Sequence, residues 1–272
     1  PAAPPSSAAE IGGATIRGIE VAGNERISSD LILARVVDTK VGEALSEDAV
    51  RGDLQRIADM GYFRDVAARF ARADGGIKVI FEVRENPVVT DVAIEGLTAV
   101  PEAAVEELLG VKEGAVLNVK ELTASARSLP DKVLERYGVP VRPVDLSVDE
   151  EGRVGLKLVE TRLAGIRIEG NKKTKDRVIL RELKLRPGQV IDINKVNSGL
   201  RNVLMLGYFD EVSRRFEDTE NPDEATLVVE VQERKTGSAS LGAGWSSTEG
   251  FLGYVEVADS NFLGRGQRVN LR

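Results

Sequence analysis

The amino-acid sequence predicts an α+β protein with three tandem repeats of the order strand, helix, helix, strand, strand, followed by the first strands of a transmembrane β-barrel. Three observations predict this fold class. The tripeptide Gly61-Tyr62-Phe63 returns as Gly207-Tyr208-Phe209, 146 residues further on. Gly23, Gly96 and Gly170 are spaced 73 and 74 residues apart. From residue 237 onward, helical spacing gives way to a weak alternation of apolar and small residues.

The composition limits the classes of function. The 272 residues carry a net charge of −7, which argues against a nucleic-acid partner because phosphate contacts need a basic surface. Histidine and cysteine are both absent, so no Ser-His or Cys-His pair and no thiolate metal site can form. We therefore expect no enzyme, no cofactor and no metal, although carboxylates distant in sequence could still meet in space.

Residues 1–15 are rich in Pro, Ala and Ser and lack apolar periodicity, so we expect a flexible N-terminal segment. Because the chain starts at Pro1 and has no signal-like apolar run, we expect that any targeting peptide has been removed. No apolar run approaches the roughly 20 residues of a membrane helix. Contact with a membrane would need another kind of element.

The first repeat is predicted over residues 16–86. Its opening strand ends at Gly23, and Ser46 can cap the second helix through its side-chain oxygen. That helix should end at Gly61, which can adopt the left-handed conformation. Alternating residues follow, and the turn Asp74-Gly75-Gly76 leads into the last strand, so the repeat closes with a hairpin.

The second repeat, predicted over residues 87–162, is irregular. Asn118 can cap a long helix, but Pro130 lies inside the apolar stripe of that helix and should kink or split it. Pro140 and Pro143 come where the return strand should begin. Because proline cannot donate to a ladder, these two residues shorten this strand or make it an edge strand.

The third repeat, predicted over residues 163–235, is regular again, and residues 236–272 differ from all that precedes them. Their alternating segments of about ten residues are typical of transmembrane β-strands. Two strands and the start of a third cannot close a barrel, and an open edge is not stable in lipid. We therefore expect an N-terminal fragment of a longer protein, truncated early in its barrel, whose last strands pair abnormally or stay mobile.

The order of these motifs carries a family resemblance. Three repeats with Gly-Tyr-Phe before the return strand, followed by Asn261-Phe262-Leu263-Gly264-Arg265-Gly266, resemble the polypeptide-transport-associated (POTRA) domains and first barrel strands of BamA-type outer-membrane protein assembly factors. The resemblance covers about residues 16–272. It implies that each repeat is a three-stranded mixed sheet with two helices on one face. It also implies that Asn261, Phe262, Gly264 and Gly266 form a barrel motif.

The resemblance has further implications for location and partners. It implies a Gram-negative outer-membrane protein whose repeats lie mostly in the periplasm and whose barrel contacts the membrane. Its implied partners are unfolded outer-membrane protein clients, periplasmic chaperones, and assembly-machinery lipoproteins or other subunits. The implied function is protein transport and membrane insertion of client barrels.

A docking mechanism follows from the repeat itself. An edge strand leaves backbone groups unpaired, and an extended segment of another chain can pair with them. In the family, the first hairpin strand is such an edge. We therefore predict partner binding by strand addition along the alternating residues Val66, Ala68, Phe70, Val144, Leu146, Val212, Arg214 and Phe216.

The recurring glycines and aromatics have a structural interpretation. Glycine tolerates the left-handed backbone of turns and helix ends, and large aromatic side chains usually serve burial. The predicted structural markers of the repeats are Gly23, Gly61, Tyr62, Phe63, Gly96, Gly170, Gly207, Tyr208 and Phe209.

Two other function classes stay open at this point. A two-partner secretion or translocation pore would use the same docking repeats to export one dedicated client. A periplasmic scaffold without a barrel is a second alternative, against which the alternation after residue 236 counts. The length and content of the gene beyond Arg272 would discriminate among the three.

Overall fold

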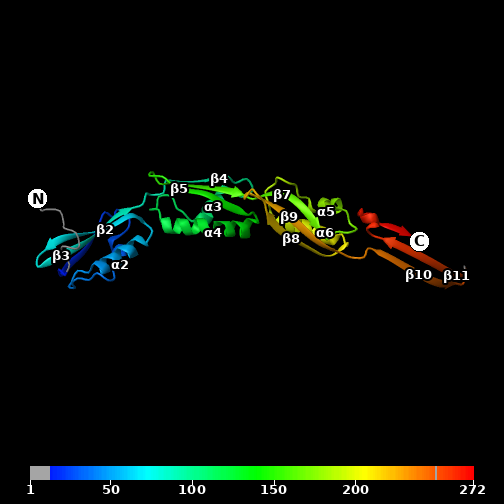
Figure 1. Cartoon of the computed structure of the whole chain (residues 1–272), viewed down its shortest axis with the longest axis horizontal. Coiled ribbons are helices and arrows are strands. Elements are labelled where there is room, and N and C mark those ends of the chain that lie inside the picture. Colours follow the sequence, from blue (N-terminus) through cyan, green and yellow to red (C-terminus); the bar gives the residue numbers. More distant parts are fainter. Residues whose placement is uncertain (1–12, 249) are drawn as a thin grey trace. The chain divides into compact units, whose positions relative to one another are not determined.

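The computed structural model describes residues 13–248 and 250–272 (Figure 1). They form two compact bodies, and the division between them falls inside the second repeat. The first body holds the first repeat and most of the second. The other body holds the rest of the second repeat, the third repeat and the last strands.

The element order of every repeat is the one predicted. The first repeat comprises β1 (Ile16–Ala22), α1 (Ser29–Leu33), α2 (Glu47–Ala58), β2 (Phe63–Ala73) and β3 (Gly76–Glu85). The second comprises β4 (Asp91–Glu95), α3 (Glu102–Leu109), α4 (Val119–Tyr137), β5 (Val141–Val148) and β6 (Arg153–Glu160). The third comprises β7 (Arg162–Glu169), α5 (Asp176–Leu183), α6 (Ile193–Met205), β8 (Phe209–Asp218) and β9 (Glu224–Glu233).

Each repeat forms one mixed three-stranded sheet. The strand orders are β1-β3-β2, β4-β6-β5 and β7-β9-β8. The opening strand runs parallel to the central strand in each sheet, and in the first and third repeats the first hairpin strand runs antiparallel to it. The predicted α+β class with mixed sheets is therefore confirmed, and β2, β5 and β8 are edge strands.

One face of each sheet supplies the core in the first and third repeats. Side chains alternate between faces along a strand. In the first repeat Val79 and Phe81 of β3 are fully buried together with Ile57 of α2. In the third repeat the same arrangement joins Leu227 and Val229 of β9 to Val203 of α6, in one cluster. The opposite sheet face lies outside these clusters.

The predicted helix caps are confirmed, and one of the two outcomes expected at Pro130 is excluded. Ser46 accepts a hydrogen bond from the N–H of Ala49 at 3.4 Å, and Asn118 accepts one from the N–H of Glu121 at 3.1 Å. Of the two outcomes expected at Pro130, a kink or a split, the split does not occur, since α4 runs unbroken through it. Leu129 and Val133 beside the proline are fully buried. Their burial anchors both halves of the helix and offsets one missing hydrogen bond.

Glycine is required after each opening strand for two reasons. Gly23, Gly96 and Gly170 have φ of +83°, +91° and +89°. A Cβ at these positions would lie 2.2, 1.9 and 2.1 Å from a carbonyl oxygen of the adjacent central strand. Backbone conformation and close approach therefore both exclude a side chain, which is a stronger constraint than a turn alone.

The last strands form a separate antiparallel sheet. It comprises β10 (Gly237–Ser246), β11 (Gly250–Asp259), a short 3₁₀ helix η2 (Phe262–Gly264) and β12 (Val269–Leu271), in the order β10-β11-β12. The β10–β11 register is continuous from one end to the other, so the prediction of abnormal pairing is wrong. Backbone pairing within this hairpin needs no further neighbour. In the part of the chain that the structure describes, no helix has the length and apolar character of a membrane span.

Candidate docking edges

The predicted docking residues of the first and third repeats lie on edge strands with their side chains toward the core. On β2, Val66 and Ala68 pack against the first core and Phe70 is buried in it. On β8, Val212 and Phe216 pack against the third core. The side chains therefore hold these strands onto their own repeats. What the strands present along the edge is backbone.

The opposite edge of each sheet is partly covered by the repeat itself. The N–H of Ile16 at the start of β1 donates to the carbonyl of Glu43 at 2.8 Å, and Leu163 of β7 donates to Gln189 at 2.8 Å. Val89 donates equivalently to Ala115 at 2.9 Å, just before β4. Among the described residues, β2 and β8 have no such loop pairing along their outer edges. The longest unpaired strand edges among the described residues therefore lie on β2 and β8.

The second repeat has a different edge. Val144 on β5 is 47% exposed, so it is less covered than the inward residues of β2 and β8, whereas Leu146 is partly exposed as they are. As predicted, the strand at Pro143 is an edge strand; it has 8 residues, against 11 for β2 and 10 for β8. A proline within β5 removes one backbone donor. This edge is therefore the weakest of the three for backbone pairing.

A groove of about 280 Å³ accompanies the free edge of the first repeat. α2 and the start of β2 form its walls. An extended segment added to β2 would place alternate side chains toward α2, over this groove. The lining residues are Arg51, Leu54, Gln55, Ala58, Phe63, Arg64, Asp65 and Val66.

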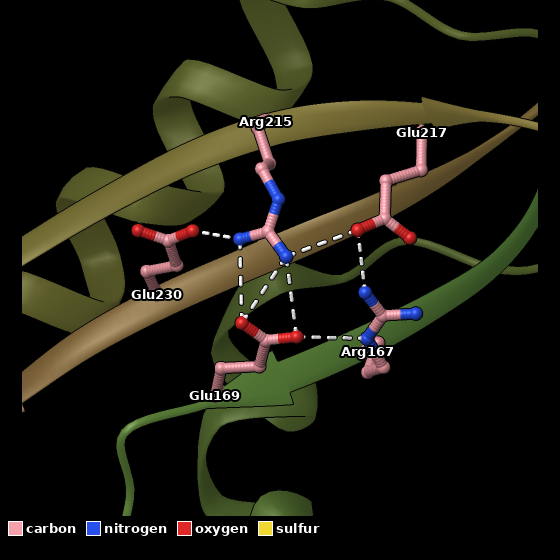
Figure 2. Close-up of polar contacts among 5 residues, drawn as sticks. All are labelled: Arg167, Glu169, Arg215, Glu217 and Glu230. Carbon is pink, nitrogen blue, oxygen red and sulfur yellow. Dashed lines mark hydrogen bonds and ion pairs between the residues drawn. The ribbon is translucent and has the colours of Figure 1, made fainter.

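The open face of the third sheet carries a network of five charged residues, which we call the charge ladder (Figure 2). Arg215 of β8 hydrogen-bonds Glu169 of β7 at 3.2 Å and Glu217 at 3.0 Å, and it also pairs with Glu230 of β9. Arg167 of β7 bonds Glu169 at 2.9 Å and Glu217 at 2.5 Å. The ladder thus ties all three strands together across the face opposite the helices.

The charge ladder covers apolar surface and lowers the pKa values of two of its glutamates. Val228, which pairs with both Arg167 and Arg215 in the sheet, is fully buried although it lies on the open face. Long arginine side chains can cover apolar surface with their stems. Hydrogen bonds from Arg167 and then Arg215 lower the pKa of Glu169 and of Glu217. Both carboxylates therefore stay ionised at neutral pH.

A second set of carboxylates caps the loop after each opening strand. Glu85 accepts from the N–H groups of Arg26 and Ile27 at 3.0 and 2.8 Å. Glu233 accepts from those of Lys173 and Thr174 at 2.8 and 2.6 Å. Glu85 and Glu233 therefore fix the loop after the opening strand in the same way in the first and third repeats.

The second repeat uses Glu160 for the same purpose. It accepts from the N–H groups of Ala99 and Val100 at 2.7 and 3.1 Å. Burial raises the pKa of Glu160, but hydrogen bonds from Thr98 and these amides outweigh burial and lower it overall. Sequence reasoning missed the three caps, although their spacing of 75 and 73 residues matches the repeat.

The two Gly-Tyr-Phe markers differ in their surroundings. Gly207 follows α6 with φ +74°, and Tyr208 and Phe209 are buried with their rings edge to face at 6.3 Å between centroids. In the first repeat, Tyr62 and Phe63 are only half-buried. Tyr62 borders a cavity of about 890 Å³ that is lined largely by residues of the second repeat.

Gly61 serves the junction between the first two repeats. It has φ +83°, and a Cβ there would lie 2.2 Å from Oδ1 of Asn118. Its carbonyl accepts hydrogen bonds from the side chain of Asn86 and the N–H of Val119, both at 2.9 Å. Gly61 therefore follows the end of α2, and it also contacts Asn118 and Val119 at the start of α4.

The predicted barrel motif folds onto the third repeat. Asn261 is 1% exposed, and its Nδ2 donates to Oγ1 of Thr174 at 2.9 Å while its Oδ1 accepts from the N–H of Gly266 at 2.8 Å. Gly264 has φ +69°, and a Cβ there would lie 1.7 Å from the carbonyl oxygen of Lys173. Phe262, by contrast, is 40% exposed.

Asp259 at the end of β11 strengthens this contact. It accepts from Nζ of Lys173 at 2.8 Å and from the hydroxyl of Thr236 at 2.7 Å. The ammonium of Lys173, the hydroxyl of Thr236 and the N–H of Asn261 lower the pKa of Asp259 to about 2. The loop capped by Glu233 is therefore also the surface on which the last sheet rests. Within residues 13–248 and 250–272, no cluster of three acidic side chains could hold a metal ion.

The three repeats, each a three-stranded sheet with two helices and an unpaired edge strand, define a tandem-repeat α+β protein. The POTRA family model, described as surface antigen variable number repeat, matches residues 14–86 and 161–234. The chain belongs to this family. The two matched stretches contain the first and third repeats, with their free edges β2 and β8.

Two relatives are similar in sequence to nearly the whole chain. The chain is 29% identical to the outer membrane protein assembly factor BamA of Neorickettsia risticii, over 93% of this chain and 37% of the relative. It is 27% identical to BamA of Neisseria meningitidis, over 95% and 36%. The chain thus spans a little over a third of the length of these relatives.

Solved structures agree on the fold. The N-terminal domain of Omp85 from Thermosynechococcus elongatus is 27% identical, with a TM-score of 0.67 over 82% of this chain and 98% of that one. POTRA domains 1–3 of Omp85 from Anabaena give 0.62 at 23% identity, over 81% and 96%. At that lower identity the likeness concerns the fold alone.

Proposed function

We propose that this chain is the periplasmic POTRA region of an outer-membrane protein assembly factor. It receives unfolded outer-membrane proteins and partner subunits, and it passes the clients to a barrel for insertion. Membership of the POTRA family and the relatives named as assembly factors support this proposal. They favour an assembly factor over a secretion pore. Binding and positioning, rather than catalysis, are the proposed activity.

The observation that carries the proposal is the pair of free edges β2 and β8. Inward side chains such as Phe70 and Val212 anchor each strand, so its outward N–H and C=O groups stay in register. Main-chain pairing depends little on the sequence of the added segment. Such edges suit clients that share extended structure but not sequence. Chaperones and lipoprotein subunits would compete for the same edges.

The last sheet supports a role at the membrane. Four exposed apolar residues, Leu241, Trp245, Phe251 and Val255, share one face because Leu241 pairs with Val255 and Trp245 with Phe251. We propose that this face meets lipid and that β10 to β12 begin a transmembrane barrel. The contacts of Asn261 and Asp259 would then hold the barrel start against the third repeat.

Neighbouring proline substitutions test strand addition. Along a strand, successive N–H groups point to opposite edges, so one of two neighbours donates inward and the other outward. We pair Ala67→Pro with Ala68→Pro on β2, and Ser213→Pro with Arg214→Pro on β8. In each pair, the variant that keeps the native thermal transition has lost an outward donor.

The expected result is a several-fold loss of crosslinking between the folded variant and a urea-denatured outer-membrane protein diluted into buffer. The other member of each pair has lost an N–H that pairs with the central strand, so it should unfold. It is the matched control, because it shows which of the two N–H groups points inward. Crosslinking at the native level in both folded variants would rule out strand addition at these edges.

A further inference from the structure

Arg214 is held in a fixed position at the free edge of the third repeat. It lies midway along β8 on the side that faces α6, and it is partly buried. Its Nε donates to Oδ1 of Asn197 at 3.0 Å, and its guanidinium carbon lies 5.4 Å from the ring centroid of Phe216. These two contacts orient the planar guanidinium without neutralising it.

Arg214 has no acidic partner among the described residues, unlike its neighbour. The contact with Asn197 uses one of the five guanidinium N–H donors. Arg215, the next residue, points to the open face and is paired with three carboxylates of the charge ladder (Figure 2). Two adjacent arginines on one edge strand therefore differ in that only one retains a free charge.

The surroundings of Arg214 favour an anion. Within its own bounds α6 contains Lys195 and Arg201 and no acidic residue, and its N-cap Asp192 pairs with Lys195. On β8, Asp218 of the same alternation is exposed at the far end of the strand, and Asp210 lies at the irregular start of the strand, where it pairs with Arg234 at 3.7 Å. A strand added beside β8 would cover Arg214 and remove water from it. Covering an unpaired cation is unfavourable, so a matching segment must bring its own carboxylate.

We propose that β8 selects extended segments that carry an acidic side chain opposite Arg214. This proposal rests on strand addition at β8, as proposed above. Because facing residues repeat every two positions, residues two before and two after the acid would lie opposite Val212 and Phe216 and should be apolar. The preferred pattern is apolar, any, acidic, any, apolar. Arg214 binds the carboxylate through two parallel N–H donors.

The first repeat lacks this selectivity. Ala68 of β2 lies 146 residues before Arg214, at the corresponding position, and it carries no charge. A segment added to β2 would meet a small side chain there. The two free edges therefore divide clients by chemistry, with acidic segments preferred at β8.

Two blocked peptides test the proposal on the full chain. One has the sequence Lys-Thr-Val-Thr-Glu-Thr-Val-Thr-Lys, and the other has Gln in place of Glu. Both are titrated into ¹⁵N-labelled protein, and Kd is taken from the amide shifts of β8. We expect the Glu peptide to bind about tenfold more tightly. The ratio of the Kd of the Gln peptide to that of the Glu peptide should fall as salt is raised. Arg214→Gln should bring the ratio to one, and Arg214→Lys should keep part of it.

Arg215→Gln is the matched control, since it removes the adjacent arginine from the open face, and it should leave the ratio unchanged. Equal Kd values at β8 for both peptides would overturn the acidic preference while leaving strand addition intact. A preference for the Glu peptide that survives Arg214→Gln would overturn it too. No shift of β8 amides with either peptide would overturn both proposals.

Discussion

The first and third repeats share a scaffold but present different surfaces on the open face of the sheet. Arg215 and Glu230 of the third repeat have counterparts in Arg69 and Glu82, which also form an ion pair. Glu169 precedes Gly170, however, whereas Ala22 precedes Gly23. Glu217 follows Phe216, whereas Ala71 follows Phe70. The third sheet is therefore sealed by one connected ladder, whereas the first sheet has two separate pairs, Arg69–Glu82 and Lys78–Glu20, and small side chains only at Ala22 and Ala71.

This difference distinguishes the residues that stabilise each repeat from the residues that determine its exposed surface. The positive-φ glycines, the carboxylate caps and the inward apolar residues occur in both repeats at matching positions. The open face and the residue at Arg214 do not match. We infer that substitutions of the shared positions will have similar effects in both repeats, and that substitutions of surface positions will not.

The largest expected effect comes from the glycine after the opening strand. Gly23→Ala and Gly170→Ala each force a Cβ against a carbonyl oxygen and should destabilise their own repeat by about 3 kcal/mol or more. Gly42→Ala and Gly188→Ala are matched controls, since φ is +93° and +85° but nothing lies within 4 Å. They should cost only about 1 kcal/mol. Hydrogen exchange resolved by repeat measures both. Equal losses of stability in the two kinds of variant would contradict the role given to the close contact between Cβ and the carbonyl oxygen.

The next effect concerns the caps. Glu233→Gln should weaken the third repeat by about 1 to 2 kcal/mol, because the charged acceptor of two amides is lost. Burial raises the pKa of Glu233, but hydrogen bonds from Lys173 and Thr174 lower it overall. The folded pKa therefore lies below the unfolded value of roughly 4.3. The stabilisation is full above that value and disappears as pH falls through the folded pKa.

Urea unfolding at several pH values tests this assignment. The stability difference between wild type and Glu233→Gln should be constant near neutral pH and should shrink under acid conditions. A difference that grows on acidification would contradict it.

A smaller effect separates the two open faces. Arg215→Gln leaves three carboxylates without their shared partner and exposes Val228, so the melting temperature should fall clearly and salt should reduce the difference. Arg69→Gln removes a single exposed pair and should leave the melting temperature almost unchanged. Equal shifts in the two variants would show that the charge ladder adds nothing beyond an isolated pair.

The smallest effect is expected from transplanting one member of the ladder. Ala71→Glu places a carboxylate two residues from Arg69, as Glu217 stands to Arg215. The gain should be at most about 0.5 kcal/mol and should vanish in high salt. Thermal unfolding at two salt concentrations measures it, with Ala71→Gln as the uncharged control. A loss of stability would mean that the two faces differ in backbone geometry as well as in charge.

Much of the fold could be predicted because its signals are local. The helix caps at Ser46 and Asn118, the turn glycines and the two-residue alternation act within a few residues of themselves. Pro130 does not split its helix, because burial on both sides of it overrides the local preference. The repeat period placed β2 and β8 correctly as the strands that follow Gly-Tyr-Phe.

Features that depend on distant partners were not predicted. The charge ladder joins Arg167 to a glutamate 50 residues away, and Glu233 caps a loop 60 residues before it. Alternation along β8 indicated one face for Val212, Arg214 and Phe216, but it could not tell that this face points to the helices. The same limit applies to Asn261: the resemblance made it part of a barrel motif, but the sequence could not tell that it is buried against Thr174.

The central claim is that β2 and β8 accept an extended client segment along their free edges. Because the natural chain has no cysteine, single cysteines can be placed in turn along β2, β8 and the central strands β3 and β9. Each variant is incubated with an unfolded outer-membrane protein that carries one cysteine, and disulfide formation is scored. We predict strong crosslinks at β2 and β8 that repeat every two residues, and weak crosslinks on β3 and β9. Crosslinks confined to the central strands, or spread evenly over all four, would contradict the claim.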